Sequence, residues 1–258
     1  MGSPPNSSLV HKKAKIADDV VIGPFSLVDN HVSIGSGTVI GSHCHIFPHT
    51  HIGKKVQVFD GAIIGSPPQD LKYKGEKTQV FIGDHSCIRE YATINAGTIV
   101  SGKTIIGQNC LIMAYAHVAH DCVLGDNVII ANGVQMGGHV SIGHTSVIAG
   151  MTGVHQFTTI GAGTFIGGGL RVAKDILPYS KALGEPLRWT GVNDRALEKL
   201  EYGLAPRGFV KKCYQILSKE GISSLEAALS LPVIDPVINK ISKEMLVFLK
   251  SRTRGILK

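Results

Sequence analysis

The residues best suited to chemistry lie in three short segments, HVAHDC at 117–122, MGGH at 136–139 and GVHQF at 153–157. They contain four histidines and one carboxylate, namely His117, His120, His139, His155 and Asp121. An imidazole changes charge near neutral pH, and a neighbouring carboxylate can orient it or stabilise its protonated form. Asp121 follows His120 directly, which is the arrangement of a general base and its partner. One such histidine alone would be read as a surface residue, but the group predicts a catalytic site.

The three segments belong to a repeat with a period of six residues. Aliphatic side chains recur at every sixth position from Ile82 to Val172, with Val100 as one member, and an earlier series runs from Val10 to Ile64. A helix repeats near 3.6 residues and a strand near 2, so neither alone gives this period. Six-residue repeats are typical of a β-helix. We therefore predict a triangular prism in which one hexad is a short strand plus a turn and three hexads make one coil.

Two further positions of the hexad fit this prism. The residue two before each aliphatic one should also point inward, since side chains alternate along a strand. These positions hold small or β-branched residues: Ser26, Thr38, Cys44, Ala62, Ala92, Cys110, Ala116, Cys122, Ser146, Thr152 and Thr164. The residue after the aliphatic one is often glycine, which is expected at a corner with positive φ or beside a crowded backbone.

Coils of eighteen residues bring distant candidates together. His120, Gly138 and Gln156 are spaced eighteen residues apart, so they should stack on one edge of the prism in three successive coils. His117, Asp121, His139 and His155 are their near neighbours in the sequence. The spacing therefore predicts one ridge that carries all the candidate catalytic groups.

Composition narrows the class of protein. The chain is 43% hydrophobic but only 6% aromatic, which fits a thin prism filled with Ile and Val. No apolar run approaches the roughly 20 residues of a membrane span, and the first eight residues, MGSPPNSS, lack the apolar core of a signal peptide. The net charge of +7 favours anionic partners without choosing among nucleotide phosphates, an acidic protein and nucleic acid.

The cysteines and a second histidine-rich segment receive simpler interpretations. Cys44, Cys110 and Cys122 occupy small inward positions and no CxxC occurs, so packing in a reducing, cytoplasmic compartment is favoured. The segment HCHIFPHTH at 43–51 offers two His-x-His pairs, but they fall in successive hexads and so on different faces of the prism. We predict surface histidines there, with no metal site.

The chain divides into four parts. Residues 1–9 are expected to be a disordered lead-in, 10–190 the β-helix, and 65–81, rich in Pro and Lys, a loop that leaves it. Such a loop is a candidate functional insertion, although it could equally be a solvated decoration. Apolar residues at helical spacing predict a C-terminal helical domain at 191–258: Phe209, Val210, Cys213, Tyr214, Leu217, Val237, Ile238, Ile241, Met245, Leu246 and Leu249. It would cap the open end of the prism and reach a neighbouring subunit.

With these motifs in view, the chain resembles the bacterial UDP-N-acetylglucosamine acyltransferases, which begin lipid A synthesis. The motifs that carry the resemblance run over nearly the whole chain: QDLKY at 69–73, IREYATI at 88–94, HVAHDC at 117–122, GGH at 137–139, GVHQF at 153–157 and SRTRGI at 251–256. The resemblance implies a left-handed parallel β-helix followed by helices, assembled as a homotrimer with active sites between subunits. It implies neither a transmembrane segment nor a nucleic-acid partner.

The resemblance also assigns roles. It implies transfer of an R-3-hydroxyacyl group from acyl carrier protein to the sugar 3-hydroxyl of UDP-N-acetylglucosamine, without metal, cofactor or covalent enzyme intermediate. His120 matches the general base, Asp121 its orienting partner, and the backbone N–H of Gly138 the oxyanion donor. The remaining matches are substrate contacts at Asp70, Lys72, His117, His139, His155, Gln156, Asn193 (uridine) and Arg207 (phosphate), and an acyl-length position at Gly168.

The chain departs from the family pattern at two places. About seven extra residues separate Asn193 from Arg207, with Pro206 where a second arginine is common, and Asn95-Ala96 replace a common His-Arg pair. The residues leave open the acyl length and whether the acceptor carries a 3-hydroxyl or a 3-amino group. Other readings are the later N-acyltransferase of the same pathway, a zinc-dependent hexapeptide carbonic anhydrase, and a purely structural solenoid such as an ice binder.

Overall fold

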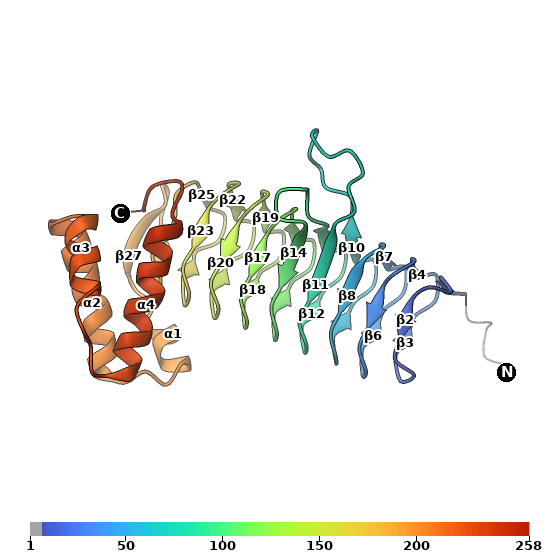
Figure 1. The fold of residues 1–258 in the computed structure, drawn as a ribbon, viewed down its shortest axis with the longest axis horizontal. Coiled ribbons are helices and arrows are strands. Elements are labelled where there is room, and N and C mark those ends of the chain that lie inside the picture. The colour runs from blue at the N-terminus through green and yellow to red at the C-terminus, as the bar shows by residue number, and fades with distance from the viewer. Residues whose placement is uncertain (1–6, 258) are drawn as a thin grey trace.

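The computed structural model describes residues 7–257 and shows a triangular prism of short parallel strands with helices at one end (Figure 1). Of the expected lead-in at 1–9, residues 1–6 lie outside the described residues, and Leu9 pairs with Leu27 in the first coil. Strands stack with an offset of eighteen residues along most of the prism; Leu111, for example, pairs with Ile129 in parallel register. Each side of the prism is one sheet.

The first sheet has nine parallel strands: β1 (Leu9–Val10), β4 (Leu27–Val28), β7 (His45–Ile46), β10 (Ile63–Ser66), β13 (Thr93–Asn95), β16 (His117–Val118), β19 (Gln135–Met136), β22 (Gly153–Val154) and β25 (Arg171–Val172). The second has eight: β2 (Lys15–Ile16), β5 (Ser33–Ile34), β8 (Thr50–Ile52), β11 (Gln79–Ile82), β14 (Lys103–Ile106), β17 (Val123–Leu124), β20 (Ser141–Ile142) and β23 (Thr159–Ile160). The third has ten: β3 (Val21–Ile22), β6 (Val39–Ile40), β9 (Gln57–Val58), β12 (Cys87–Ile88), β15 (Leu111–Ile112), β18 (Ile129–Ile130), β21 (Val147–Ile148), β24 (Phe165–Ile166), β26 (Ser180–Leu183) and β27 (Arg188–Val192).

The prism is filled as the hexad predicts. Every aliphatic member of the two series from Val28 to Val172 is buried except Val100, and the eleven small residues predicted to point inward are all buried. Their hydroxyl groups are satisfied inside: Ser26 Oγ donates to Gly41 O over 2.7 Å and Thr38 Oγ1 to Gly53 O over 2.8 Å. Small polar residues therefore fit the core without leaving an unpaired donor at these positions.

Glycine follows the aliphatic residue because the backbones of successive coils are crowded there. A Cβ on Gly83 would lie 2.5 Å from the carbonyl carbon of Gly107, and one on Gly35 2.8 Å from that of Gly53. Positive φ instead occurs three residues after the aliphatic one, as at Asp121 (59°) and His139 (60°). Because that position turns each corner, its side chain projects from an edge of the prism.

The prediction that Val100 belongs to the core is wrong, because a second loop leaves the prism at this position. Thr93 pairs with His117, twenty-four residues on instead of eighteen, and Val100 is 74% exposed. The loop at 96–102 lengthens this coil by six residues, one hexad, so the period continues in phase after it and the sequence gives no sign of the loop. The predicted first loop is larger: Ile63 pairs with Thr93, thirty residues on, and 67–78 project outward between β10 and β11 (Figure 1).

This correction gives a stability prediction. Val100→Ala should change the free energy of unfolding by less than about 0.5 kcal/mol, as expected of an exposed site. Val58→Ala, the same replacement at a core position with 2% exposure, should cost about 2 kcal/mol, because two buried methyl groups are lost. Denaturant unfolding of both variants measures the difference, and equal losses would contradict the assignment of 96–102 to a loop.

The end of the chain forms a cap. β26 extends the third sheet in parallel and β27 returns antiparallel to it, a hairpin the sequence did not predict. Four helices follow: α1 (Asp194–Lys199), α2 (Leu204–Lys219), α3 (Ile222–Leu229) and α4 (Pro236–Ser251). The helical spacing read from the sequence is confirmed in α2 and α4, where Val210, Cys213, Ile241 and Met245 are buried, whereas α3 was not predicted. Among the described residues, no helix combines the length and apolarity that a membrane span requires.

Candidate active site

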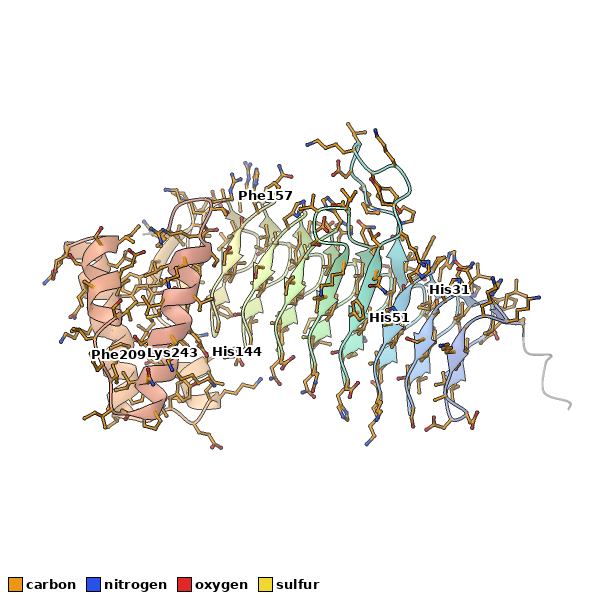
Figure 2. The ribbon with its side chains drawn as sticks, viewed as in Figure 1. His31, His51, His144, Phe157, Phe209 and Lys243 are labelled. Atoms are coloured by element: carbon orange, nitrogen blue, oxygen red, sulfur yellow. The ribbon has the colours of Figure 1, made fainter. Side chains whose placement is uncertain are left out.

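The edge between the first and second sheets carries the candidate catalytic residues; we call it the histidine edge. Both loops leave from it, since 67–78 connects β10 to β11 and 96–102 connects β13 to β14. Backbone hydrogen bonds stack its corners: His139 N donates to His120 O and Phe157 N to Gly138 O, each over 3.0 Å. His120, Gly138 and Gln156 thus occupy equivalent places in three successive coils, and Figure 2 shows Phe157 on the side from which the large loop projects.

His120 and Asp121 form a hydrogen-bonded pair at this edge. His120 Nδ1 lies 2.8 Å from Asp121 Oδ2, and the side chains are 12% and 0% exposed. Burial alone would raise the pKa of Asp121, but hydrogen bonds from Ser101, Thr98 and His120 outweigh it and lower the pKa to about 2. Because an ionised carboxylate only accepts hydrogen bonds, His120 Nδ1 must be the donor. In the neutral imidazole, Nε2 is therefore left bare and able to take a proton.

The carboxylate of Asp121 is held by the second loop, which sequence reasoning missed. Thr98 N donates to Oδ1 over 2.9 Å and Thr98 Oγ1 to Oδ2 over 2.7 Å, while Ser101 Oγ also contacts Oδ1. From the other side, Asp121 N donates to Thr104 Oγ1 over 2.9 Å. No sequence signal marked Thr98, because the hexad 96–101 imitates the repeat, with a β-branched residue two positions before Val100.

Gly138 packs directly on the His120 ring. A Cβ at this position would lie 2.4 Å from Cε1 and 2.6 Å from Nε2 of His120, so only glycine leaves room for the imidazole. Among the described residues, no group accepts a hydrogen bond from the Gly138 backbone N–H. A free N–H therefore lies beside the atom that would act as base.

The other predicted histidines surround this pair to different degrees. His139 meets His120 edge-on at 5.1 Å between ring centroids and stacks on Phe157 at 4.5 Å. His117 shares a 2.7 Å hydrogen bond with Thr93 Oγ1. Burial lowers the pKa of both His117 and His139, so these rings favour the neutral state. His155 and Gln156 are exposed one coil further on.

Of the two contacts predicted in the large loop, Asp70 acts electrostatically on the histidine edge. The charge of Asp70 acts on His139, where it raises the pKa against the larger effect of burial. Asp70 Oδ1 accepts a hydrogen bond from Lys72 N over 2.9 Å, which shapes the loop. The Lys72 side chain is exposed, and within residues 7–257 its ammonium group has no hydrogen bond or ion pair.

Three predicted residues do not lie on the histidine edge of the same chain. Gly168 stands at the edge between the third and first sheets, where a Cβ would meet Gly150 O at 3.0 Å. Asn193 caps α1 and donates to Gly163 O over 2.8 Å, at the edge between the second and third sheets. Arg207 pairs with Glu198 Oε1 over 3.1 Å in the helical cap. Within one chain, these three residues therefore lie on different sides of the molecule from His120.

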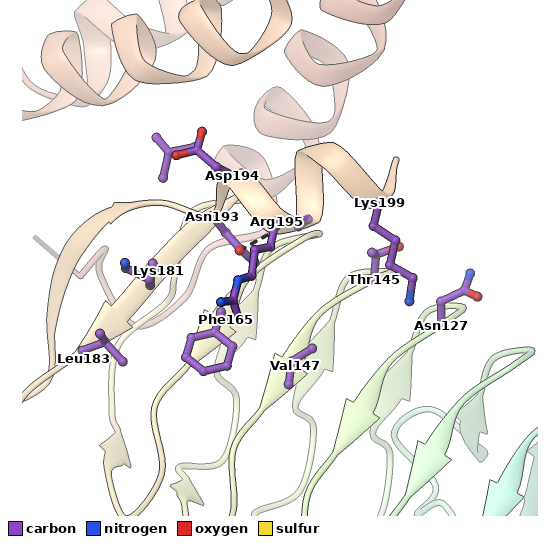
Figure 3. A pocket seen from close by; sticks show the side chains of 12 residues that line it. Asn127, Thr145, Val147, Phe165, Lys181, Leu183, Asn193, Asp194, Arg195 and Lys199 are labelled. Atoms are coloured by element: carbon purple, nitrogen blue, oxygen red, sulfur yellow. Dashed lines mark hydrogen bonds between the residues drawn. The ribbon is translucent and has the colours of Figure 1, made fainter. Parts of the chain in front are cut away.

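Asn193 also lines a separate cleft of about 570 Å³ between α1 and the third sheet. Figure 3 shows Arg195 and Lys199 reaching over it from α1 and Phe165 and Lys181 facing it from the prism. The two positions at which the chain departs from the family pattern lie elsewhere. Pro206 is buried in the first turn of α2. Asn95 Nδ2 donates to Ser66 Oγ over 2.8 Å, and this bond joins the bases of the two loops.

Within residues 7–257, three side chains of the histidine edge could in principle hold a metal ion. One group, His120, Asp121 and His139, brings three ligand atoms within 4.8 Å of one another. A carboxylate offers about four acceptor positions, and those of Asp121 are already engaged by Thr98, Ser101 and His120. A metal ion would have to displace those donors, so the geometry favours a hydrogen-bonded pair.

The histidines of 43–51 behave as predicted for the prism surface. His45 belongs to the first sheet and pairs with Asp29 Oδ2 at 2.9 Å, whereas His51 belongs to the second and shares a 2.8 Å hydrogen bond with Ser33. His49 stacks on His31 at 5.0 Å, lower on the histidine edge. Their different faces and separate partners agree with the prediction.

Comparison with known proteins identifies the family. A family model described as bacterial transferase hexapeptide (six repeats) matches residues 13–48 and 103–138, and one described as domain 2 of UDP-N-acetylglucosamine O-acyltransferase matches 175–257. The acyl-[acyl-carrier-protein]–UDP-N-acetylglucosamine O-acyltransferase of Thiobacillus denitrificans is 43% identical over 253 residues, 98% of each chain. The chain belongs to this family. The namesake protein of Aliarcobacter butzleri is 41% identical over 251 residues, 97% of this chain and 96% of its own.

Solved structures of the O-acyltransferase family have the same fold. The UDP-N-acetylglucosamine acyltransferase of Bacteroides fragilis superposes with a TM-score of 0.90 at 35% identity over 100% of both chains. LpxA from Acinetobacter baumannii gives a TM-score of 0.92 at 32% identity over 98% of both. The fold is thus the left-handed parallel β-helix with C-terminal helices that the resemblance predicted.

Proposed function

We propose that this protein transfers an R-3-hydroxyacyl group from acyl carrier protein to the 3-hydroxyl of UDP-N-acetylglucosamine, the first step of lipid A synthesis, with His120 as general base. The observation that carries the proposal is the buried 2.8 Å pair of His120 and Asp121 beside the free N–H of Gly138. Its context is a chain 43% identical, over 98% of its length, to a protein of this name.

The pair supports proton transfer at His120 Nε2. The bare Nε2 takes the proton of the sugar hydroxyl as its oxygen attacks the thioester carbonyl carbon. The buried anion of Asp121 stabilises the imidazolium that results, because opposite charges attract strongly where water is excluded. When the C–S bond breaks, the same proton passes from Nε2 to the leaving thiolate, so His120 returns to its starting state.

Gly138 supports the charge that develops on the carbonyl oxygen. An N–H without a protein acceptor can donate to that oxygen as it becomes an anion, and such a donor contributes most in a site shielded from water. His117 and His139, kept neutral by burial, would line the sugar side with polar groups that carry no competing charge. Asp70 and Lys72 would reach the substrates from the large loop.

We further propose that the active unit is a homotrimer with each site between two subunits. Gly168, Asn193 and Arg207 lie at other edges or in the cap, so they can join His120 only from a neighbouring copy. Cyclic assembly of identical chains supplies such shared sites. In that arrangement Asn193 and Arg207 would contact the nucleotide, and Gly168 would limit the acyl chain.

Mixed trimers test the shared site. His120→Ala and Arg207→Ala chains, each defective alone, should regain activity when co-expressed with different tags and purified as mixed oligomers. A trimer that contains both kinds of chain has about one site in three that draws an intact histidine from one chain and an intact arginine from the next, whichever chain is present twice. Co-expression of His120→Ala with Asp121→Ala, which affects the same chain's pair, is the control. No recovery in isolated mixed trimers would contradict the arrangement.

The function itself is tested by direct assay. Purified protein is incubated with UDP-N-acetylglucosamine and a series of R-3-hydroxyacyl carrier proteins, and the acylated nucleotide is identified by mass. The preferred acyl length reports the room left by Gly168. No product from folded oligomers would refute the acceptor, and the 3-amino sugar nucleotide would be the next substrate. Zinc content and CO₂ hydration of the same sample address the carbonic anhydrase reading, for which we expect neither stoichiometric metal nor activity.

The net charge and the cysteines of the chain are consistent with the proposed carrier protein and with a cytoplasmic location. A basic chain, with net charge +7, suits an acidic carrier protein because opposite net charges accelerate encounter. All five cysteines are free thiols, and burial raises the pKa of Cys122 to about 12, which keeps it protonated. These thiols are consistent with a reducing, cytoplasmic compartment.

A further inference from the structure

The second loop, residues 96–102, has a structural purpose that its exposed tip does not explain. Ile99 and Val100 are 76% and 74% exposed, so the loop adds little to the core. Thr98, at its centre, is only 5% exposed and faces Asp121. The loop is closed around this residue, since Gly102 N donates to Thr98 O over 2.8 Å and Val100 N to Thr98 Oγ1 over 3.3 Å.

Thr98 donates hydrogen bonds to both oxygens of the Asp121 carboxylate. Its N–H donates to Oδ1 over 2.9 Å and its hydroxyl to Oδ2 over 2.7 Å, which fixes the plane of the carboxylate. Ser101 Oγ adds a contact to Oδ1 but also lies 2.9 Å from Lys103 O, so its single proton is shared between two acceptors. Thr98 is therefore the stronger of the two restraints.

The orientation matters because two imidazoles compete for one oxygen. Oδ2 lies 2.8 Å from His120 Nδ1 and 3.6 Å from His139 Nε2. A carboxylate free to rotate could pair with His139 instead. His120 Nδ1 would then lose its acceptor, and the ring could adopt the tautomer with the proton on Nε2, which is unable to act as a base.

We propose that Thr98 is a positioning residue for catalysis: it locks the Asp121 carboxylate onto His120 and so selects the tautomer whose Nε2 is bare. The catalytic consequence rests on the proposed function, whereas the tautomer can be measured without substrate. The second loop would then take part in catalysis through Asp121, the residue whose carboxylate it binds.

The test compares Thr98→Val, which keeps the shape and the backbone N–H but removes the hydroxyl, with Thr98→Ser, which retains it. In protein labelled with ¹⁵N-histidine, NMR correlation of ring protons with ring nitrogens reports the tautomer, and the His120 signals are assigned by their absence in His120→Ala. We expect wild type and Thr98→Ser to hold the proton on Nδ1, and Thr98→Val to populate the Nε2–H form. In the acyl-transfer assay, kcat should fall about tenfold in Thr98→Val with KM within about twofold, since one hydrogen bond to a charged group is lost.

Thr38→Val is the matched control, because it removes a prism hydroxyl that donates to Gly53 O far from the site; its tautomer and kcat should equal those of wild type. A Thr98→Val protein with wild-type tautomer and kcat overturns the proposal, as does a Thr98→Ser protein as impaired as Thr98→Val. Should Thr98→Val fail to fold, Thr98→Ala decides, because it also removes the hydroxyl that donates to Asp121 Oδ2 but adds no methyl group in its place. We expect the same loss of about tenfold in kcat with a measurable Nε2–H population, and no change in either overturns the proposal. If wild type acylates no nucleotide, the proposed function fails while the tautomer still tests Thr98.

Discussion

His120→Ala should lower kcat by at least about a hundredfold, the largest loss expected of any single replacement in this chain. The replacement removes the bare imidazole nitrogen that lies next to Gly138. It should leave the fold intact, because Asp121 still accepts hydrogen bonds from Thr98 and Ser101 and so is not left as a buried, unpaired anion. Initial rates with saturating UDP-N-acetylglucosamine and acyl carrier protein, together with thermal unfolding, measure both effects.

His31→Ala is the matched control for this loss. His31 projects from the same edge and stacks on His49 at 5.0 Å, but it belongs to an earlier coil and no described contact joins it to Asp121. Its removal should leave kcat within about twofold of wild type, as is usual for an exposed side chain away from a site. If His120→Ala turned over as fast as wild type, the family assignment would stand and His120 would be discarded as the base.

Gly138→Ala should separate catalysis from stability. A Cβ at this position would overlap the His120 ring, 2.4 Å from Cε1 and 2.6 Å from Nε2, so the imidazole must move away from its 2.8 Å bond with Asp121. Misplacing a catalytic group by about 1 Å costs on the order of a hundredfold in rate. The atoms that move are the end of a side chain, so the free energy of unfolding should change by less than about 1 kcal/mol.

Two other glycines serve as controls for this prediction. A Cβ on Gly153 meets no atom within 4 Å, so Gly153→Ala should retain both activity and stability. A Cβ on Gly83 would lie 2.5 Å from the backbone of Gly107, which cannot move aside, so Gly83→Ala should lose stability instead. Activity assays and denaturant unfolding on all three variants distinguish the roles. Full activity in Gly138→Ala would show that the His120 ring need not occupy its present position.

The fold could be predicted from the sequence because the hexad is a packing rule that repeats. An aliphatic residue every six positions fills the prism, a small residue two before it fits beside it, and a glycine after it lets coils approach. The rule also allowed the spacing of eighteen to put His120, Gly138 and Gln156 on one edge. It failed at Val100, because an inserted loop of one hexad leaves the period in phase and only strand pairing reveals it.

What the sequence by itself determined was the coil, the edge and the residues on it, since each depends on local periodicity and on side chains of fixed type. What only the tertiary structure decided was how those residues are oriented. Thr98 and Asp121 are twenty-three residues apart in sequence and meet because a loop folds back over the edge. The contact of Gly138 with the His120 ring and the separation of Gly168, Asn193 and Arg207 onto other parts of the chain arise in the same way, because they depend on distances between coils that no spacing along the chain encodes.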